Sequence, residues 1–149
     1  HGATWMTLSC GGNDIILQPH GFGVDLDQYK RNIDRIAKRA AAWNVNLVIL
    51  TPTPIGPDLT SANNQMLQKY NEFLRQYAKD HHLLLADVNS VFTAALRKNP
   101  GKPLFFDATH PNADGQFIIG MTVLRALGVP DSDMPRLEAA LRKDEAAGR

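Results

Sequence analysis

The sequence of 149 residues predicts an α/β fold built on a parallel sheet. Short apolar segments typical of strands alternate along the chain with longer segments whose apolar residues recur every three or four positions, as on one face of a helix. A helix between two strands brings the chain back to the same end of the sheet, so successive strands run parallel. The length is that of one domain with its own hydrophobic core.

Three segments are predicted to be strands. Residues 3–10 mix threonine and tryptophan with apolar side chains and end at Gly11-Gly12. Residues 45–51 and 83–88 are apolar enough to be covered on both faces of the sheet. The sequence therefore predicts three strands, of which the later two are fully buried.

Helices are predicted after side chains that can accept hydrogen bonds from the free amides of a first helical turn. Asp25, Ser61 and Asn112 each precede such a segment. Asp25 together with Gln28 also resembles a capping box, in which each residue bonds the backbone of the other. A shorter helix is predicted at residues 89–98.

The apolar faces of these helices predict part of the core. At helical spacing they present Leu26, Tyr29, Ile33, Ile36, Ala40 and Trp43, then Met66, Tyr70, Phe73 and Tyr77, then Phe117, Met121, Leu124 and Leu127. Trp5 of the first strand is predicted to lie in the core with Trp43. Residues 131–149 are predicted to form an amphipathic helical extension of a single domain that spans residues 1–149.

Composition and charge exclude several functions. Sixteen basic and fifteen acidic side chains leave a net charge of +1, and the basic ones are scattered, which argues against nucleic acid or an anionic membrane as a partner. No apolar run approaches the ~18 residues that span a bilayer. With 44% apolar and 21% charged residues the composition is that of a soluble globular protein, and it leaves the compartment open.

Cysteine and histidine usage gives no sign of a disulfide or a metal. Cys10 is the one cysteine, which excludes an internal disulfide. His20, His81 and His82 lack the spacing of a metal site, so no metal is expected.

Asp107 and His110 are the first candidates for chemistry. In a loop, a spacing of three lets the carboxylate fold back onto imidazole Nδ1, which fixes the tautomer and leaves Nε2 free to accept a proton from a nucleophile. The alternative is a helix-entry motif, in which Asp107 caps backbone amides and His110 is a surface residue.

The second candidate is the segment that follows the first predicted strand. Gly11 and Gly12 permit a positive φ and a close backbone approach. Asn13 supplies an uncharged amide donor that suits a developing oxyanion. The alternative is a turn in which Asn13 and Asp14 bond their own backbone.

These residues are expected at one rim of the sheet. In parallel sheets, sites gather at the carboxyl ends of the strands, where the Gly11 segment, residues 51–54 and residues 87–89 are expected to meet the Asp107 loop. The proline-rich residues 51–64 are either a rim of an acyl pocket or a plain loop stiffened by proline.

Together the two segments resemble the SGNH hydrolases, also called the GDSL esterase/lipase family. G-x-N-D closes an early strand at Gly11–Asp14, D-x-x-H-P-N opens the last sheet helix at Asp107–Asn112, and the resemblance runs from residue 3 to about residue 128. It implies a three-layer α/β/α flavodoxin-like fold. It also implies hydrolysis of a small-molecule or glycan ester through an acyl-serine, with no metal or organic cofactor.

The resemblance assigns roles to the candidate residues. His110 is the general base and then the acid, and Asp107 orients it. Asn13, with Gly11 and Gly12, belongs to the oxyanion hole or substrate-binding region.

Two blocks of the family pattern are absent from this sequence. The G-D-S that carries the nucleophile and the block with a second oxyanion glycine are missing, and Ser61, Ser90 and Ser132 lie at helix starts or in the C-terminal tail. Ser9 and Cys10 remain as minor candidates for the nucleophile, and Cys10 is better explained as a small buried residue.

The absent blocks predict an N-terminally incomplete SGNH domain whose first strand or strands are missing. The missing segment, or a second copy of this chain, is then expected to cover residues 3–9. Two alternatives are kept: a non-catalytic or truncated SGNH-like binding module, and a flavodoxin-like binding domain. The flavodoxin-like alternative needs a phosphate-binding loop after its first strand, which the apolar residues following Gly12 do not favour.

Overall fold

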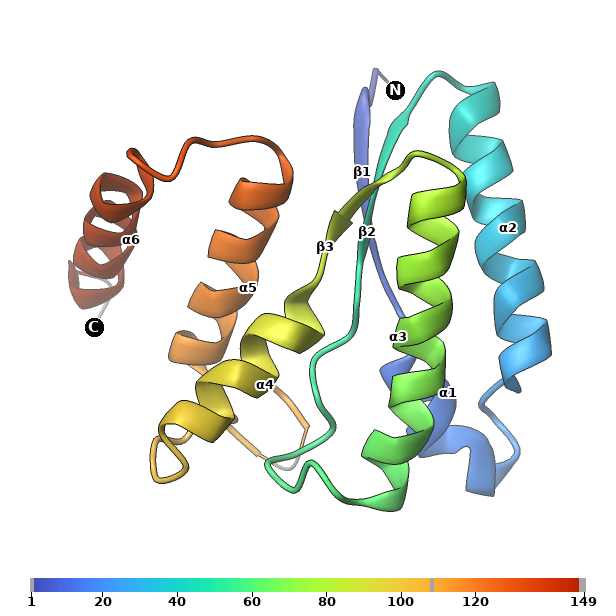
Figure 1. Cartoon of the computed structure of the whole chain (residues 1–149), viewed down its shortest axis with the longest axis horizontal. Coiled ribbons are helices and arrows are strands. Elements are labelled where there is room, and N and C mark those ends of the chain that lie inside the picture. The colour runs from blue at the N-terminus through green and yellow to red at the C-terminus, as the bar shows by residue number, and fades with distance from the viewer. Residues whose placement is uncertain (1, 108, 148–149) are drawn as a thin grey trace.

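The computed structural model describes residues 2–107 and 109–147 and has the predicted α/β architecture (Figure 1). Its elements in chain order are β1 (Trp5–Ser9), α1 (Gly12–Leu17), the 3-10 helix η1 (Gln18–His20), α2 (Leu26–Ala42), β2 (Asn46–Leu50), α3 (Ala62–Asp80), β3 (Leu84–Ala86), α4 (Val88–Lys98), α5 (Ala113–Ala126) and α6 (Met134–Ala147). Among the described residues, no helix is long and apolar enough to cross a membrane.

The three strands form a parallel sheet in the order β1-β2-β3. Residues 47–50 of the central strand are all at most 6% exposed, as expected for a strand covered on both faces. The strand predicted at residues 83–88 is shorter, because Asp87 leaves the sheet to cap α4, where its side chain accepts a hydrogen bond from the amide of Ser90.

Helices cover both faces of the sheet. Leu47 and Ile49 of β2 pack into a core with residues of α2 and α3. Val48 and Leu50 point to the other face and pack against α5. In Figure 1, α2 and α3 lie on one side of the sheet, and α5 and α6 lie on the other. The predicted three-layer α/β/α arrangement is confirmed.

The predicted helix caps are confirmed, but the capping box is incomplete. Asp25 Oδ1 accepts from the amide of Gln28 at 2.7 Å, and Ser61 and Asn112 cap α3 and α5 in the same way. The Gln28 side chain does not return the bond to Asp25. It bonds instead to Asn32 and Arg31, one helical turn further along.

Both tryptophans were wrongly predicted to lie in the core. Trp43 is 73% exposed, because it follows the last buried residue of α2, and the Arg39 guanidinium lies over its ring, 5.9 Å from the ring centroid. Trp5 is 52% exposed. Met6 and Leu8 face the α2 and α3 core, so Trp5 points to the opposite face, where α5 packs on β2 and β3.

The prediction missed two short helices, α1 and η1, which it treated as a turn and loop after the first strand.

The C-terminal helix α6 packs on α5. There the Arg142 guanidinium lies 4.3 Å from the Phe117 ring centroid and 3.4 Å from an Asp114 carboxylate oxygen. The assignment of residues 131–149 as an extension of one domain stays a prediction.

Candidate active site

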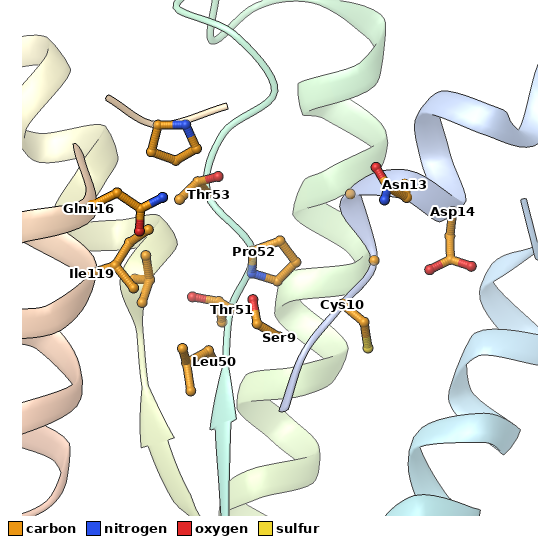
Figure 2. A pocket seen from close by; sticks show the side chains of 14 residues that line it. Ser9, Cys10, Asn13, Asp14, Leu50, Thr51, Pro52, Thr53, Gln116 and Ile119 are labelled. Atoms are coloured by element: carbon orange, nitrogen blue, oxygen red, sulfur yellow. The ribbon is translucent and has the colours of Figure 1, made fainter. Parts of the chain in front are cut away.

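A cleft of about 350 Å³ lies at the carboxyl ends of the strands (Figure 2). We call it the rim cleft. Its lining residues come from four segments, namely Ser9–Asp14, Leu50–Thr53, Val88, and Pro111 with Gln116 and Ile119. The first of these contains the predicted Gly-Gly-Asn, and the second contains the predicted Thr-Pro-Thr.

Gly11 has a conformation and surroundings that favour glycine. Its φ is +120°, and a β-carbon there would lie 3.2 Å from Tyr29 Oη and 3.3 Å from Pro52 Cγ. The chain can therefore turn sharply from β1 into α1. That turn brings Gly12 and Asn13 to the wall of the rim cleft.

Asn13 lies in the first turn of α1 and is exposed. Its side chain makes no hydrogen bond to the residues that the structure describes, so the self-bonded turn considered for Asn13 and Asp14 is not formed. The amide is free to donate into the cleft, and its role in an oxyanion hole stays a prediction.

Asp107 and His110 form the contact expected from their spacing. Asp107 Oδ2 lies 2.7 Å from His110 Nδ1, while Oδ1 accepts hydrogen bonds from the amides of Thr109 and His110, both at 2.8 Å. Asp107 thus caps backbone amides, as the alternative required, and also holds the imidazole. The amide bonds from His110 and Thr109, with the imidazole, hold the Asp107 pKa well below its usual range.

The loop that carries this pair is tied to the start of α5. The amide of Phe106 donates to the carbonyl of His110 at 2.7 Å, and Phe105 pairs with Pro111 in an antiparallel bridge. Asn112 extends the connection, because its backbone and side-chain amides donate to Leu104 and Pro103. The imidazole itself is 78% exposed.

The structure only partly assembles the predicted residues. Gly11, Gly12 and Asn13 line the rim cleft with Pro111. Asp107 and His110, on the adjoining loop, are not among the residues that line it. Asp107 instead borders a second hollow beside α4.

The minor nucleophile candidates differ in their surroundings. Burial raises the pKa of the Cys10 thiol, which disfavours the nucleophilic thiolate. Ser9 is exposed and lines the rim cleft, and its hydroxyl has no hydrogen bond to the described residues. Neither side chain is hydrogen-bonded to His110 in the part of the chain that the structure describes.

The sequence reasoning missed two cleft residues on α5, Gln116 and Ile119. The α5 helix was analysed for its apolar stripe, and Gln116 is an exposed polar residue outside that stripe. Its position one turn after Asn112 was the available signal, because the first turn of α5 faces the strand ends. Across the described ranges, no group of three His, Cys, Asp or Glu side chains could hold a metal ion.

Comparisons with known proteins agree with this architecture. Residues 1–117 match the GDSL-like Lipase/Acylhydrolase family. No curated protein matches the chain. Axe2, an acetylxylan esterase from Geobacillus stearothermophilus, is similar in structure at a TM-score of 0.74 and 22% identity, over 85% of this chain and 60% of that chain.

A second solved structure is LAE5, an alpha/beta hydrolase from the metagenome of Lake Arreo, Spain. It has a TM-score of 0.73 and 26% identity, over 84% of this chain and 60% of its own. Further structures are of catalytic mutants of Axe2, in which a serine, an aspartate or a histidine is replaced with alanine. The chain spans about 60% of the length of these structures.

The family match covers residues 1–117, which include both the Gly11–Asp14 segment and the Asp107–Asn112 loop. The resemblance seen in the sequence is therefore confirmed. This chain belongs to the GDSL-like Lipase/Acylhydrolase family.

Proposed function

We propose that this chain supplies the aspartate, the histidine and part of the oxyanion hole of a serine-dependent ester hydrolase. The observation that carries the proposal is the 2.7 Å contact between Asp107 Oδ2 and His110 Nδ1. Membership of the GDSL-like family and structural likeness to esterases support ester hydrolysis in general.

The contacts of Asp107 suit a residue that orients a catalytic base. Two amide donors fix Oδ1, and the lowered pKa keeps the carboxylate charged at neutral pH. The charged Oδ2 then favours the tautomer of His110 with its proton on Nδ1. Nε2 is left to take the proton of a serine hydroxyl and later to return it to the leaving alcohol.

Asn13 is proposed to stabilise the oxyanion of the tetrahedral intermediate, with Gly11 and Gly12 shaping that wall. Its amide is uncharged, has no bond to a described side chain and lines the rim cleft. A donor fixed on a helix needs little reorganisation as the negative charge develops.

We place the nucleophilic serine outside residues 1–149. The catalytic aspartate and histidine replaced in the Axe2 mutants are three positions apart, as Asp107 and His110 are. In that enzyme the serine precedes the aspartate by 176 positions (from 15 to 191), whereas 106 residues precede Asp107 here. Ser9 lies only 98 positions before Asp107 (from 9 to 107), so it is a poor match.

The open edge of β1 is the proposed contact for the segment that carries the serine, or for a second copy of this chain. β1 pairs with β2 along one edge, and among the described residues nothing pairs with the other. An unpaired strand edge templates pairing with another chain. Light scattering on the isolated chain tests this, because a stable monomer with freely exchanging amides at residues 5–9 would contradict it.

Substrates are proposed to be small or glycan esters. Axe2 is an acetylxylan esterase, and other Axe2 structures are of an acetyl-xylooligosaccharide esterase. The resemblance in fold makes an acetylated sugar the first substrate to try, and no cofactor is needed for this mechanism.

The test is His110→Ala in the polypeptide that carries both these residues and the serine. Loss of the proton acceptor should lower kcat on p-nitrophenyl acetate by about 10⁴–10⁶-fold. His20→Ala is the matched control, because His20 is exposed on η1 and outside the rim cleft. A His110 variant that kept more than a tenth of kcat would rule out this role.

A second arm uses residues 1–149 alone. A fluorophosphonate probe reacts with an activated serine, so we expect no stoichiometric labelling. Labelling mapped to Ser9 would make Ser9 the nucleophile. If the full polypeptide has no esterase activity at all, the binding-module alternative replaces the enzyme.

A further inference from the structure

The rim cleft suits a neutral ligand. None of its lining residues is lysine, arginine or histidine, and Asp14 is the one charged residue among them. A phosphate or carboxylate would therefore meet no cation from these residues and would face a carboxylate. A ligand without charge meets neither obstacle.

The accessible lining of the rim cleft is divided about equally between polar and apolar atoms. Leu50 and Val88 line it, but they are only 6% and 2% exposed, because they pack in the core beneath α5. The hydrophobic contribution of a contact scales with the apolar area removed from water, and these two residues have little left to lose. The apolar contacts open to a ligand therefore come from other lining residues, such as Ile119 and Pro111, and the polar groups lie beside them.

Two threonines of the Thr-Pro-Thr segment have different tasks. Thr51 is 1% exposed, and its hydroxyl is fully used, since it donates to Asp87 at 2.8 Å and accepts from the amide of Asn89 at 2.9 Å. Thr53 is only partly buried, and its hydroxyl has no bond to the described residues. Thr51 thus links the end of β2 to the start of α4, while the Thr53 hydroxyl is free to bind a ligand.

Gln116 faces Thr53 from the other side of the cleft. Figure 2 shows its side chain extending from α5 toward Thr53. The carboxamide is exposed and makes no hydrogen bond within the described residues. It therefore presents a free donor and a free acceptor on the side of the cleft that faces Thr53.

Both side chains come from firmly held backbone. Thr53 lies between two buried prolines, and the carbonyl of Pro52 accepts a 3.0 Å hydrogen bond from the Asn89 side chain. Gln116 belongs to the first turn of α5, where its amide donates to the Asn112 carbonyl at 2.8 Å. Groups fixed before binding lose less entropy when a ligand arrives.

We propose that Gln116 and Thr53 form a specificity subsite for the hydroxyl groups of a sugar that carries the ester. A sugar is neutral, and its hydroxyls donate and accept, as the carboxamide and the threonine hydroxyl do. This inference rests on the proposed esterase function and adds the residues that select a carbohydrate ester over an ester without hydroxyls.

The test compares two acetate esters of similar ring size in the polypeptide that carries the nucleophile. One is a mono-O-acetylated methyl xyloside, which has free hydroxyls, and the other is cyclohexyl acetate, which has none. Gln116→Ala and Thr53→Val should each lower the ratio of kcat/KM for the xyloside to that for cyclohexyl acetate by about three- to tenfold, because one hydrogen bond to the sugar is lost.

Gln68→Ala is the control, because it makes the same substitution at an exposed helical position on α3, outside the rim cleft. It should leave the ratio unchanged. A ratio that stays within twofold of wild type in both the Gln116 and the Thr53 variants would overturn the subsite while leaving the esterase intact. A wild-type protein that hydrolyses neither ester would overturn the proposed function and the subsite with it.

Discussion

Gly115 controls how the Asp107–His110 loop meets α5, and replacing it with alanine should push the two apart. A β-carbon at Gly115 would lie 2.4 Å from the Leu104 carbonyl oxygen, 2.8 Å from Pro111 Cβ and 3.1 Å from Phe92 Cζ. The first two distances are shorter than real β-carbon contacts. The nearest atom belongs to the backbone, which cannot swing aside as a side chain can.

The magnitude follows from two opposing effects. Overpacking costs about 1–3 kcal/mol, and the clash with backbone places Gly115 in the upper part of that range, about 2–3 kcal/mol, whereas replacing glycine by alanine in a helix gains about 1 kcal/mol. We therefore expect a net loss of about 1–2 kcal/mol for Gly115→Ala. In a chain of this size that lowers Tm by about 2–8 °C.

Gly120 is the matched control within α5. A β-carbon there would meet nothing within 4 Å, so Gly120→Ala should keep the helix gain alone and raise Tm by about 2–4 °C. Thermal unfolding followed by circular dichroism measures both variants. If Gly115→Ala were as stabilising as Gly120→Ala, the close approach of the loop to α5 would be refuted.

Two further predictions concern buried polar groups. The three tyrosines of the chain, Tyr29, Tyr70 and Tyr77, are all buried. Burial raises the pKa of each phenol above 10, to about 12 for Tyr77. Because the folded state favours the neutral phenols, its stability should fall as pH rises above 10 through the folded pKa values, and absorbance at 295 nm should show less phenolate at pH 10 in the folded chain than in the urea-unfolded chain. Equal phenolate absorbance in the two states would contradict the burial. Thr51→Val leaves the Asn89 amide without its 2.9 Å acceptor and should cost about 1–3 kcal/mol in urea unfolding, whereas Thr53→Val should change stability by no more than about 0.5 kcal/mol. Equal effects of the two substitutions would show that the Thr51 bonds contribute nothing.

Periodicity predicted the elements whose burial depends on spacing alone. The central strand, residues 46–50, reads as an unbroken apolar run after Asn46 and is buried on both faces. The α3 helix repeats apolar residues at steps of three and four, and Tyr70 and Leu74 lie in the core as that spacing requires. Side-chain caps at Asp25, Ser61 and Asn112 marked the helix starts correctly, because capping is a contact within four residues.

Features that depend on the assembly of distant elements were missed. Trp5 has the composition of a core residue, but its burial depends on whether a helix covers that face of β1. The short α1 helix begins with glycine, and its position depends on close packing, since a β-carbon at Gly23 would lie 1.8 Å from the Asp14 carbonyl oxygen. No local pattern encodes either fact.

The contrast between local spacing and the packing of distant elements also explains which part of the candidate site could be predicted from the sequence. The Asp107–His110 contact spans three positions and is held by bonds within its own loop, so spacing alone could predict it. The rim cleft joins β1, β2 and α5, and its free groups at Thr53 and Gln116 meet only after the sheet has formed. The Asp107–His110 pair, which we propose as the orienting acid and the catalytic base, can thus be preassembled by one short segment. The proposed substrate contacts at the rim need the whole α/β scaffold, so we expect loop substitutions to change catalysis and rim substitutions to change specificity.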